Sequence, residues 1–434
     1  MIISYFIAKN KQRQRKARYI MAIPVPEKRI KEFENMGLGM FIHFGMYSQL
    51  GCGEWIMNIA GMSVEQYSPL KDTFTAKDFD AKKIVEIAKA AGMKYITITT
   101  KHHDGFCLYD SKDLNGGYDT VHSACGRDLI REFVDACNEG GILPVFYHAT
   151  LDWYQKSFEE DFPTFLKYLN DSVELLCTQY GKIGGLWFDG NWSRAASDWD
   201  EDTLYATIRK HQPDALIINN TGLDARGCAG HPEIDSVTFE QGRPTPMNRE
   251  GMPKYLAAEM CQTMNDHWGY GKADFNYKSL PELIETLCAC RKVGANFLLN
   301  VGPDGDGNII PMQEVMLRGL GDWVKTCGGT SIYTGKPSEI KGEFKNFALE
   351  DEEKAYLYIH DLAILGNAHV TVEGGGVGFK HFTNVKRKVK SVKWGDNGQE
   401  LDFVQHGDHL WVNASGFPYG CQYVVRIADV EFED

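Results

Sequence analysis

The sequence predicts an α/β protein: a (β/α)8-like (TIM) barrel followed by a C-terminal antiparallel β-sandwich. Helical and β-branched segments alternate from Pro24 to about Thr330, which is typical of a parallel sheet with crossover helices. Beyond Thr330, short strand-like runs separated by turn residues replace them. The 434 residues accommodate both units, because a (β/α)8 barrel takes about 250 residues.

The alternating pattern is clear from the helix–strand pair at residues 81–100 onward. Residues 81–91 place apolar side chains on one helical face, and Gly92 follows them as a stop signal. Residues 95–100 form a β-branched run, as buried parallel strands do. Four more pairs follow, with the helix before the strand each time: 129–137 and 143–148, 165–180 and 185–188, 204–210 and 215–219, and 283–293 and 296–301.

Polar residues at strand ends favour a closed barrel over an open, doubly wound sheet. A barrel gathers the carboxyl ends of all its strands at one face. A doubly wound sheet concentrates polar groups at one switch point, usually with a glycine-rich phosphate loop, and the sequence contains no GxGxxG or Walker A motif. Polar residues follow nearly every predicted strand: Lys101, His102, His103, Asp104, His148, Asp152, Asp189, Asn219, Asn220 and Asn300.

The C-terminal region has a different pattern. Its short runs alternate partly with period two, and clusters of Gly, Asn and Asp separate several of them, as in small all-β domains. We therefore expect a barrel over residues 21–334 and a β-sandwich over residues 335–434. The predicted strands cover residues 355–362, 369–372, 389–394, 402–405, 409–412 and 422–427.

The first 20 residues are unlike the rest of the chain. They carry six basic and no acidic residues. Residues 1–8 are apolar and precede the basic run 9–18, whereas a signal peptide places its charges first. We expect a disordered basic tail or an upstream translation artefact, with Met21 as an alternative start.

Charge and cysteine content exclude several classes of partner and site. The chain has 46 Lys and Arg against 59 Asp and Glu, a net charge of −13. Nucleic acids and anionic membranes require basic faces, so we expect neither as a partner. No apolar run reaches the length of about 18 residues that a membrane span requires. The 11 scattered cysteines include no CxxC pair, which predicts free thiols, a cytoplasmic location and no structural zinc.

Asp189 is the first candidate for chemistry. It directly follows the apolar strand 185–188, so we expect its carboxylate at the mouth of the barrel, with Trp187 on the same side two residues earlier. Trp192 would line the same cleft. In the alternative interpretation, Asp189 caps the helix or loop that follows.

The segment 100–106 contains adjacent histidines and an aspartate. His102, His103 and Asp104 form either a metal site, a set of structural groups, or a set of hydrogen-bonding partners for a polar ligand. Neighbours on a strand point in opposite directions, and metal ligands on regular structure are more often two or four residues apart. We favour contact with a polar ligand, since imidazole both donates and accepts hydrogen bonds.

A third cluster lies near the start of the barrel. His43 ends the apolar stretch 40–42, and Glu54 stands beside Trp55; the alternatives are a buried core histidine and a solvated loop acid. Together with Asp189 and the histidines, these residues predict a cleft with acids, imidazoles and tryptophans. Such a cleft suits acid–base hydrolysis of a polyol, because glycosidases need one carboxylate to attack and another to protonate the leaving oxygen.

Several longer motifs resemble α-L-fucosidases of glycoside hydrolase family 29. They occur in order from about residue 35 to residue 320 and cover some two thirds of the chain. The family combines a (β/α)8-like barrel with a C-terminal β-sandwich, in agreement with the expectation from the strand pattern. The motifs are FIHFG at 41–45, GEW at 53–55, AKAAGMKY at 88–95, KHHDGF at 101–106, LDW at 151–153, LWFDG at 186–190, HWGY at 267–270 and GANFLLNVGP at 294–303.

The resemblance implies roles for individual positions. Asp189 matches the family's catalytic nucleophile, which forms a covalent fucosyl-enzyme. Trp268 falls where the family places an aromatic ring against the apolar side of the sugar. Further positions match residues that contact the fucose ring and its hydroxyls: His43, Glu54, Trp55, His102, His103, Tyr147 and Trp187.

The resemblance leaves three candidates for the general acid/base. The segment 235–242 (DSVTFEQG) resembles the stretch that holds this residue, which favours Glu240. Its apolar neighbours would raise the pKa of a carboxyl group, as a proton donor near neutral pH requires. Glu259 and Glu233 are the alternatives. The chain also reads Thr221 where many family members have an arginine, and Arg226 or Arg243 are candidates to replace that guanidinium.

The sequence therefore predicts a retaining α-L-fucosidase that acts on fucosylated glycans and needs neither a metal ion nor an organic cofactor. Two other hypotheses stay open at this point. One is a catalytically silent carbohydrate-binding protein on the same barrel, and the other is a metal-dependent hydrolase centred on His102, His103 and Asp104. A homo-oligomer is compatible with the sequence, and the C-terminal domain is either a buttress or a sugar-binding module.

Overall fold

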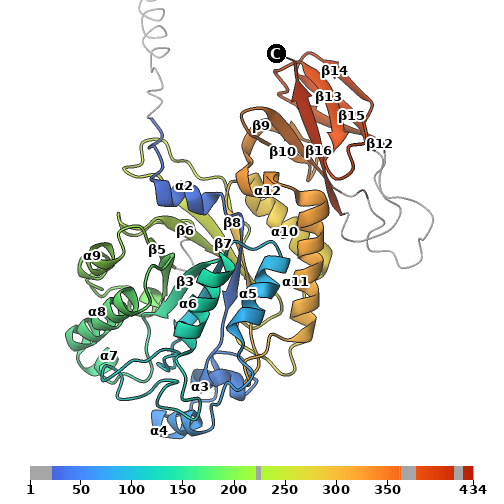
Figure 1. Ribbon diagram of the computed structural model, residues 1–434. Helices are drawn as coiled ribbons and strands as arrows, with labels where there is room; N and C mark the ends of the chain where they lie inside the picture. Colours follow the sequence, from blue (N-terminus) through green and yellow to red (C-terminus); the bar gives the residue numbers. More distant parts are fainter. Residues whose placement is uncertain (1–21, 221–225, 361, 363–377, 415–423, 434) are drawn as a thin grey trace, which may run out of the picture.

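The computed structural model contains an eight-stranded parallel barrel and a separate antiparallel sheet (Figure 1). The barrel closes in sequence order, because β1 (Leu38–Ile42) pairs in parallel with both β2 (Tyr95–Lys101) and β8 (Asn296–Val301). The (β/α)8-like barrel and the second, C-terminal antiparallel β-domain are thus confirmed. The described residues are 22–220, 226–360, 362, 378–414 and 424–433.

The barrel strands are short and almost completely buried. Five of them, β2, β3, β4, β5 and β8, coincide with predicted strands to within one residue at each end. The bounds are β1 Leu38–Ile42, β2 Tyr95–Lys101, β3 Leu143–Ala149, β4 Gly185–Asp189, β5 Leu216–Asn219, β6 Ser236–Glu240, β7 Ala257–Thr263 and β8 Asn296–Val301.

Helices surround this barrel (Figure 1), and their ends follow local sequence signals. In α6, the Asp128 side chain accepts a hydrogen bond from the backbone N–H of Arg131, and Gly141 ends the helix with a left-handed φ of 70°. The helical segments are α2 Lys28–Glu34, α3 Ile56–Ile59, α4 Val64–Tyr67, α5 Ala81–Ala90, α6 Leu129–Gly140, α7 Ser157–Glu160, α8 Phe162–Gln179, α9 Glu201–His211, α10 Leu280–Lys292, α11 Pro311–Trp323 and α12 Ser331–Thr334. Short turns of 3-10 or π helix are η1 Met46–Gln49, η2 Ser68–Asp72, η3 Asn191–Arg194 and η5 Val324–Gly328.

Two crossovers depart from the regular alternation. The described residues 226–235, between β5 and β6, contain no helix, and neither do residues 241–256, between β6 and β7. The second connection reads QGRPTPMNREGMPKYL, and its prolines and glycines oppose helix formation. Within the described residues, no helix combines the length and apolar character needed to cross a membrane.

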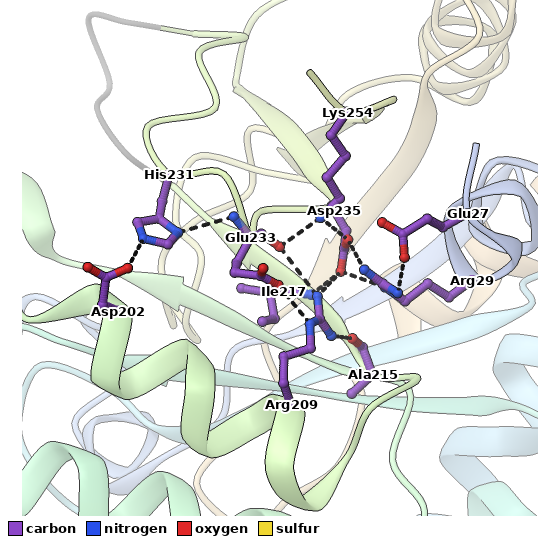
Figure 2. Close-up of polar contacts among 10 residues, drawn as sticks. All are labelled: Glu27, Arg29, Asp202, Arg209, Ala215, Ile217, His231, Glu233, Asp235 and Lys254. Atoms are coloured by element: carbon purple, nitrogen blue, oxygen red, sulfur yellow. Dashed lines mark hydrogen bonds and ion pairs between the residues drawn. The ribbon is translucent and has the colours of Figure 1, made fainter. Parts of the chain in front are cut away.

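Buried ion pairs hold the amino-terminal end of the barrel together (Figure 2). Asp235, just before β6, has a fully buried carboxylate that contacts three cations: Arg29 Nη2 at 2.9 Å, Arg209 Nη2 at 2.8 Å and Lys254 Nζ at 2.7 Å. It also accepts the backbone N–H of Ile217 at 3.0 Å. Burial opposes ionisation, but these partners, Arg29 first, bring the pKa of Asp235 below its usual value.

The C-terminal sheet contains eight antiparallel strands in the order β13-β16-β11-β10-β9-β12-β15-β14. The sheet curls so that its two ends meet, since the N–H of Val389 in β13 donates to Gln405 Oε1 in β14 at 2.9 Å. One apolar core fills the space between its halves. The bounds are β9 Lys336–Gly342, β10 Phe347–Glu350, β11 Lys354–His360, β12 Gly378–Thr383, β13 Val389–Trp394, β14 Phe403–His406, β15 His409–Ala414 and β16 Val425–Phe432.

The C-terminal sheet packs against the barrel at the side of α11 and α12, away from α3 and α4 (Figure 1). Trp323 Nε1 donates to the carbonyl of Val425 at 2.8 Å, and the Ser331 and Tyr358 hydroxyls are 2.8 Å apart. Phe347 and Tyr358 belong to the same apolar cluster as the barrel helices. These contacts join the C-terminal sheet to the barrel helices. The strand predicted at 369–372 and the tail at 1–20 lie outside the described residues.

Candidate active site

A cavity of about 280 Å³ opens at the carboxyl ends of the barrel strands. The wall combines aromatic rings with two carboxyl groups, as a sugar site requires. The predicted residues His43, Trp55, His102, His103, Tyr147, Trp187, Asp189, Glu240 and Trp268 all line it. Trp192, also expected in this cleft, lines it too, and three further lining residues are Phe41, Asn220 and Cys261.

Glu54 does not line this cavity. Its side chain is buried, with 6% exposure, and Oε2 accepts the backbone N–H of Gly269 at 2.8 Å. Because Gly269 follows Trp268, Glu54 supports the backbone beside a cavity-lining ring. The loop acid predicted from the sequence is thus neither solvated nor at the cavity surface.

Asp189 ends β4 and accepts hydrogen bonds at both carboxylate oxygens. Trp192 Nε1 lies 3.0 Å and Asn220 Nδ2 3.3 Å from Oδ1, and the Tyr147 hydroxyl lies 3.1 Å from Oδ2. His103 Nε2 is 3.5 Å from Oδ2. Burial raises the pKa of Asp189, but the contacts with His103, Trp192 and Tyr147 outweigh it, and the pKa lies below its ordinary value. Asp189 is therefore ionised at neutral pH, as a nucleophile must be.

Glu240 ends β6 and has the opposite electrostatic character. Burial, followed by the nearby charge of Asp189, raises the pKa of Glu240 to about 7. The hydrogen bond from Asn220 and the charge of Arg226 oppose this rise. A carboxyl group with this pKa is partly protonated near neutral pH and can give a proton to a leaving oxygen.

One amide links the two carboxyl groups. Asn220 Nδ2 lies 3.3 Å from Asp189 Oδ1 and 2.6 Å from Glu240 Oε2. These two oxygens are therefore no more than about 6 Å apart. Carboxyl groups are about 5–5.5 Å apart in retaining glycosidases and about 6.5–9.5 Å apart in inverting ones, so the spacing suits retention.

The two rival acids lie elsewhere. Glu259, in β7, has 1% exposure, and its oxygens accept hydrogen bonds from the Tyr95 hydroxyl at 2.5 Å and Trp187 Nε1 at 2.9 Å. Glu233 contacts Arg209 Nε at 2.9 Å in the cluster at the opposite end of the barrel (Figure 2). Neither lines the cavity.

Two histidines of the cavity, His43 and His102, are neutral groups. Burial lowers the pKa of His43 to about 3, and its Nδ1 lies 2.7 Å from Asn300 Oδ1. Since the amide oxygen only accepts, this contact places the proton on Nδ1 and leaves Nε2 as an acceptor. Burial also lowers the pKa of His102 well below its ordinary value. Neutral imidazoles can exchange hydrogen bonds with sugar hydroxyls in both directions.

The geometry does not favour a metal centre at His102, His103 and Asp104. Asp104 turns away from the cavity, where its Oδ2 accepts the Tyr67 hydroxyl at 2.9 Å and its Oδ1 the N–H of Phe106 at 3.2 Å. Within the described part of the chain, one group of three side chains is close enough together to hold a metal ion. It consists of Asp110, Asp119 and His122. Those three lie further along the same connection between β2 and α6.

Asn220 is the functional candidate that sequence reasoning overlooked. In the sequence it is one of several polar residues at strand ends, and that position is its only signal. Thr221, the next residue, lies outside the described residues. Of the two candidate arginines, Arg226 acts on the pKa of Glu240, whereas the charge of Arg243 acts on Cys290.

Known proteins are similar to this chain in sequence and fold. A family model described as alpha-L-fucosidase matches residues 6–329. Plasma alpha-L-fucosidase of Homo sapiens is 26% identical over 394 residues, which cover 79% of this chain and 81% of that protein. Tissue alpha-L-fucosidase of Bos taurus is 28% identical over 343 residues, covering 72% of this chain and 70% of that protein.

Solved structures agree with this match. Alpha-L-fucosidase isoenzyme 1 from Paenibacillus thiaminolyticus has a TM-score of 0.81 and 31% identity, with 94% of this chain and 99% of that chain covered. An alpha-L-fucosidase of glycoside hydrolase family 29 from Bacteroides thetaiotaomicron shares the fold, with a TM-score of 0.80, 21% identity, and 95% and 96% of the two chains covered. Because the family model matches well over half of its residues, this chain belongs to the alpha-L-fucosidase family, glycoside hydrolase family 29, and is a glycoside hydrolase.

Proposed function

We propose that this enzyme hydrolyses terminal α-L-fucosides of fucosylated glycans by double displacement, with Asp189 as nucleophile and Glu240 as general acid/base. The observation that supports this most strongly is the shared contact with Asn220, which keeps an ionised and a protonatable carboxyl group at the spacing of a retaining pair. The opposite pKa shifts of the two groups match their two roles.

The first step forms a covalent ester. A carboxylate oxygen of Asp189 attacks the anomeric carbon, the bond from that carbon to the leaving oxygen breaks, and Glu240 gives its proton to that oxygen. In the second step, Glu240 takes a proton from water as the water oxygen attacks the anomeric carbon. The ester bond breaks, the carboxylate of Asp189 is restored, and L-fucose leaves with its original anomeric configuration.

The cavity wall suits fucose. The sugar carries an apolar 6-methyl group, for which Phe41, Trp187 and Trp268 offer aromatic surface. Its hydroxyls need polar partners, and His43, His102 and His103 lie on the same wall. Trp55 and Trp192 stack at 6.0 Å between ring centroids, with 24° between their planes, and both line the cavity.

Turnover of an aryl α-L-fucoside by wild type and Asp189→Asn tests the proposal. The amide keeps the size of the side chain but cannot attack carbon, so we expect turnover to fall at least about 1,000-fold. Glu233→Gln is the matched control and should retain wild-type turnover. Absence of turnover in folded wild type would instead favour the silent carbohydrate-binding protein.

We also propose a cytoplasmic location, which rests on the sequence and on the buried thiols. Cys137, Cys177 and Cys288 are buried and form no disulfide. Burial raises the pKa of each thiol, so they stay protonated and unreactive. Cell fractionation tests this, and recovery of the enzyme from the medium alone would contradict it. Two further expectations stay predictions. Binding assays would test whether nucleic acids or membranes are partners, and light scattering would test whether the protein forms a homo-oligomer.

A further inference from the structure

We propose that Asn220, oriented by Thr238, is a positioning residue that donates hydrogen bonds to the carboxyl groups of both Asp189 and Glu240. During the reaction the negative charge moves from Asp189 to Glu240, and Asn220 stays hydrogen-bonded to whichever group is charged. This inference rests on the proposed function. It concerns three adjacent strands of the barrel: Asp189 ends β4, Asn220 follows β5, and Glu240 ends β6.

The backbone places Asn220 between its two partners. Its N–H donates to the carbonyl of Phe188 at 2.8 Å, and Phe188 directly precedes Asp189. Asn220 side-chain atoms reach in the other direction to β6, where both Thr238 and Glu240 are partners. Because Thr238 and Glu240 are two residues apart on one strand, they face the same side.

The contact with Thr238 fixes the direction of the amide. The Thr238 hydroxyl donates to Asn220 Oδ1 at 2.8 Å, so the amide oxygen faces the threonine and the Nδ2 hydrogens face the two carboxyl groups. The reversed amide would turn its oxygen toward the carboxylate of Asp189, and Nδ2 would no longer donate to either carboxyl group. Thr238 has 5% exposure and does not line the cavity, so it acts through Asn220 alone.

The two amide hydrogens suit a reaction in which one negative charge changes place. In the free enzyme, Asp189 is the anion and Glu240 carries the proton. After the first displacement, Asp189 is a neutral ester and Glu240 is the anion. Asn220 Nδ2 contacts both groups, so it donates to the charged one in either state. A dipole that needs no reorientation lowers the barrier of both steps.

The pH dependence of kcat/KM in Thr238→Val, with Thr238→Ser as matched control, tests this role. Valine keeps the shape but removes the hydroxyl, so the amide can turn its oxygen to the protonated Glu240. We expect the basic limb of the profile to move to higher pH by about 0.5–1 unit. The value of kcat/KM at the optimum pH should fall about 10-fold. Serine keeps the hydroxyl and should keep the wild-type limb.

Asn220→Ala gives a second, independent reading if the valine variant fails to fold. Removal of the donor should shift the basic limb in the same direction and lower kcat more than it raises KM. An unchanged basic limb in active Thr238→Val or Asn220→Ala, or equal shifts in Thr238→Val and Thr238→Ser, would overturn the positioning role while leaving the proposed function in place. Turnover that survives in Asp189→Asn would overturn both.

Discussion

Trp187 and Glu259 are joined beneath the cavity: the indole Nε1 donates to Glu259 Oε1 at 2.9 Å, while the indole ring lines the cavity above. Burial raises the pKa of Glu259 to about 7, as burial and the charge of Asp189 do for Glu240. Glu240 and Glu259 therefore have similar pKa values but occupy different positions relative to the cavity. Geometry, not pKa, assigns the proton donor, because only Glu240 lines the cavity.

Leaving-group dependence separates the two glutamates. For Glu240→Gln, we expect turnover of a fucoside with a poor alkyl or saccharide leaving group to fall about 100- to 10,000-fold. The formation of the covalent ester from a fucoside with a good leaving group, such as dinitrophenol, should be much less affected, because that oxygen needs no proton. Rapid-mixing measurements of phenol release test this.

Glu259→Gln is the control for this experiment. It replaces one of the two oxygens that accept from the Tyr95 hydroxyl and Trp187 Nε1 by an NH2 group, so stability and KM should change. The ratio of rates for poor and good leaving groups should stay at the wild-type value. A change of that ratio in Glu259→Gln, with a wild-type ratio in Glu240→Gln, would exchange their assignments.

The pH profile of kcat/KM should be bell-shaped. Glu240 must be protonated, so activity falls as pH rises through its pKa of about 7. Asp189 must be ionised, and its lowered pKa keeps it so in weak acid; activity is lost only below the ordinary carboxyl value of about 4. Preincubation at each pH separates unfolding from titration. A basic limb near pH 4.5 would show that Glu240, or another donor, titrates as an unperturbed carboxyl group.

Arg226 should tune this basic limb. Its charge lowers the pKa of Glu240, so Arg226→Ala should raise that pKa and move the limb to higher pH by about 0.5 unit at low salt. The effect should shrink as salt rises, because Arg226 is exposed. Arg243→Ala is the matched control and should leave the limb in place. Equal shifts in the two variants would contradict a specific effect of Arg226.

The cluster around Asp235 should contribute to stability and not to catalysis (Figure 2). Asp235→Asn leaves three cations facing an uncharged group, so the free energy of unfolding should fall by about 3 kcal/mol. Since the folded pKa of Asp235 lies below its unfolded value, its contribution is complete above the unfolded pKa and is lost as pH falls through the folded pKa.

Denaturant unfolding at pH 7 and at pH 3 measures this contribution. Glu27→Gln serves as the surface control, because Glu27 contacts Arg29 with a half-exposed side chain. It should change the free energy of unfolding by less than about 1 kcal/mol. An Asp235→Asn variant as stable as wild type at pH 7 would show that the buried cluster adds no net stability.

Much of the barrel could be predicted because its strands carry local signals. β2 is a β-branched run and β4 an apolar run that ends at Asp189, so both their position and the face of their terminal residues follow from the sequence. β6 and β7 were not predicted as strands. Their segments SVTFE and AAEMCQT are short and mixed, and no helix in residues 241–256 separates them to complete the usual alternation.

The sequence could predict only those site residues whose position follows from the end of a single strand. Asp189 and Trp187 follow from one strand and the alternation of its side chains. Asn220 becomes important through contacts with β4 and β6, and those contacts depend on the strand order of the closed barrel. Glu54 shows the same limit, since its partner Gly269 is 215 positions away in the sequence.

Mass spectrometry of the covalent intermediate tests the central claim most directly. Incubation with a 2-fluoro-fucosyl fluoride, whose fluorine slows the second displacement, should add one fluorofucosyl group to the intact enzyme, and peptide mapping should place it on Asp189. Glu240→Gln should accumulate the same adduct, and Asp189→Asn should form none. An adduct on another residue, or turnover of an aryl α-L-fucoside with inversion at the anomeric carbon and no adduct, would contradict the double displacement through Asp189.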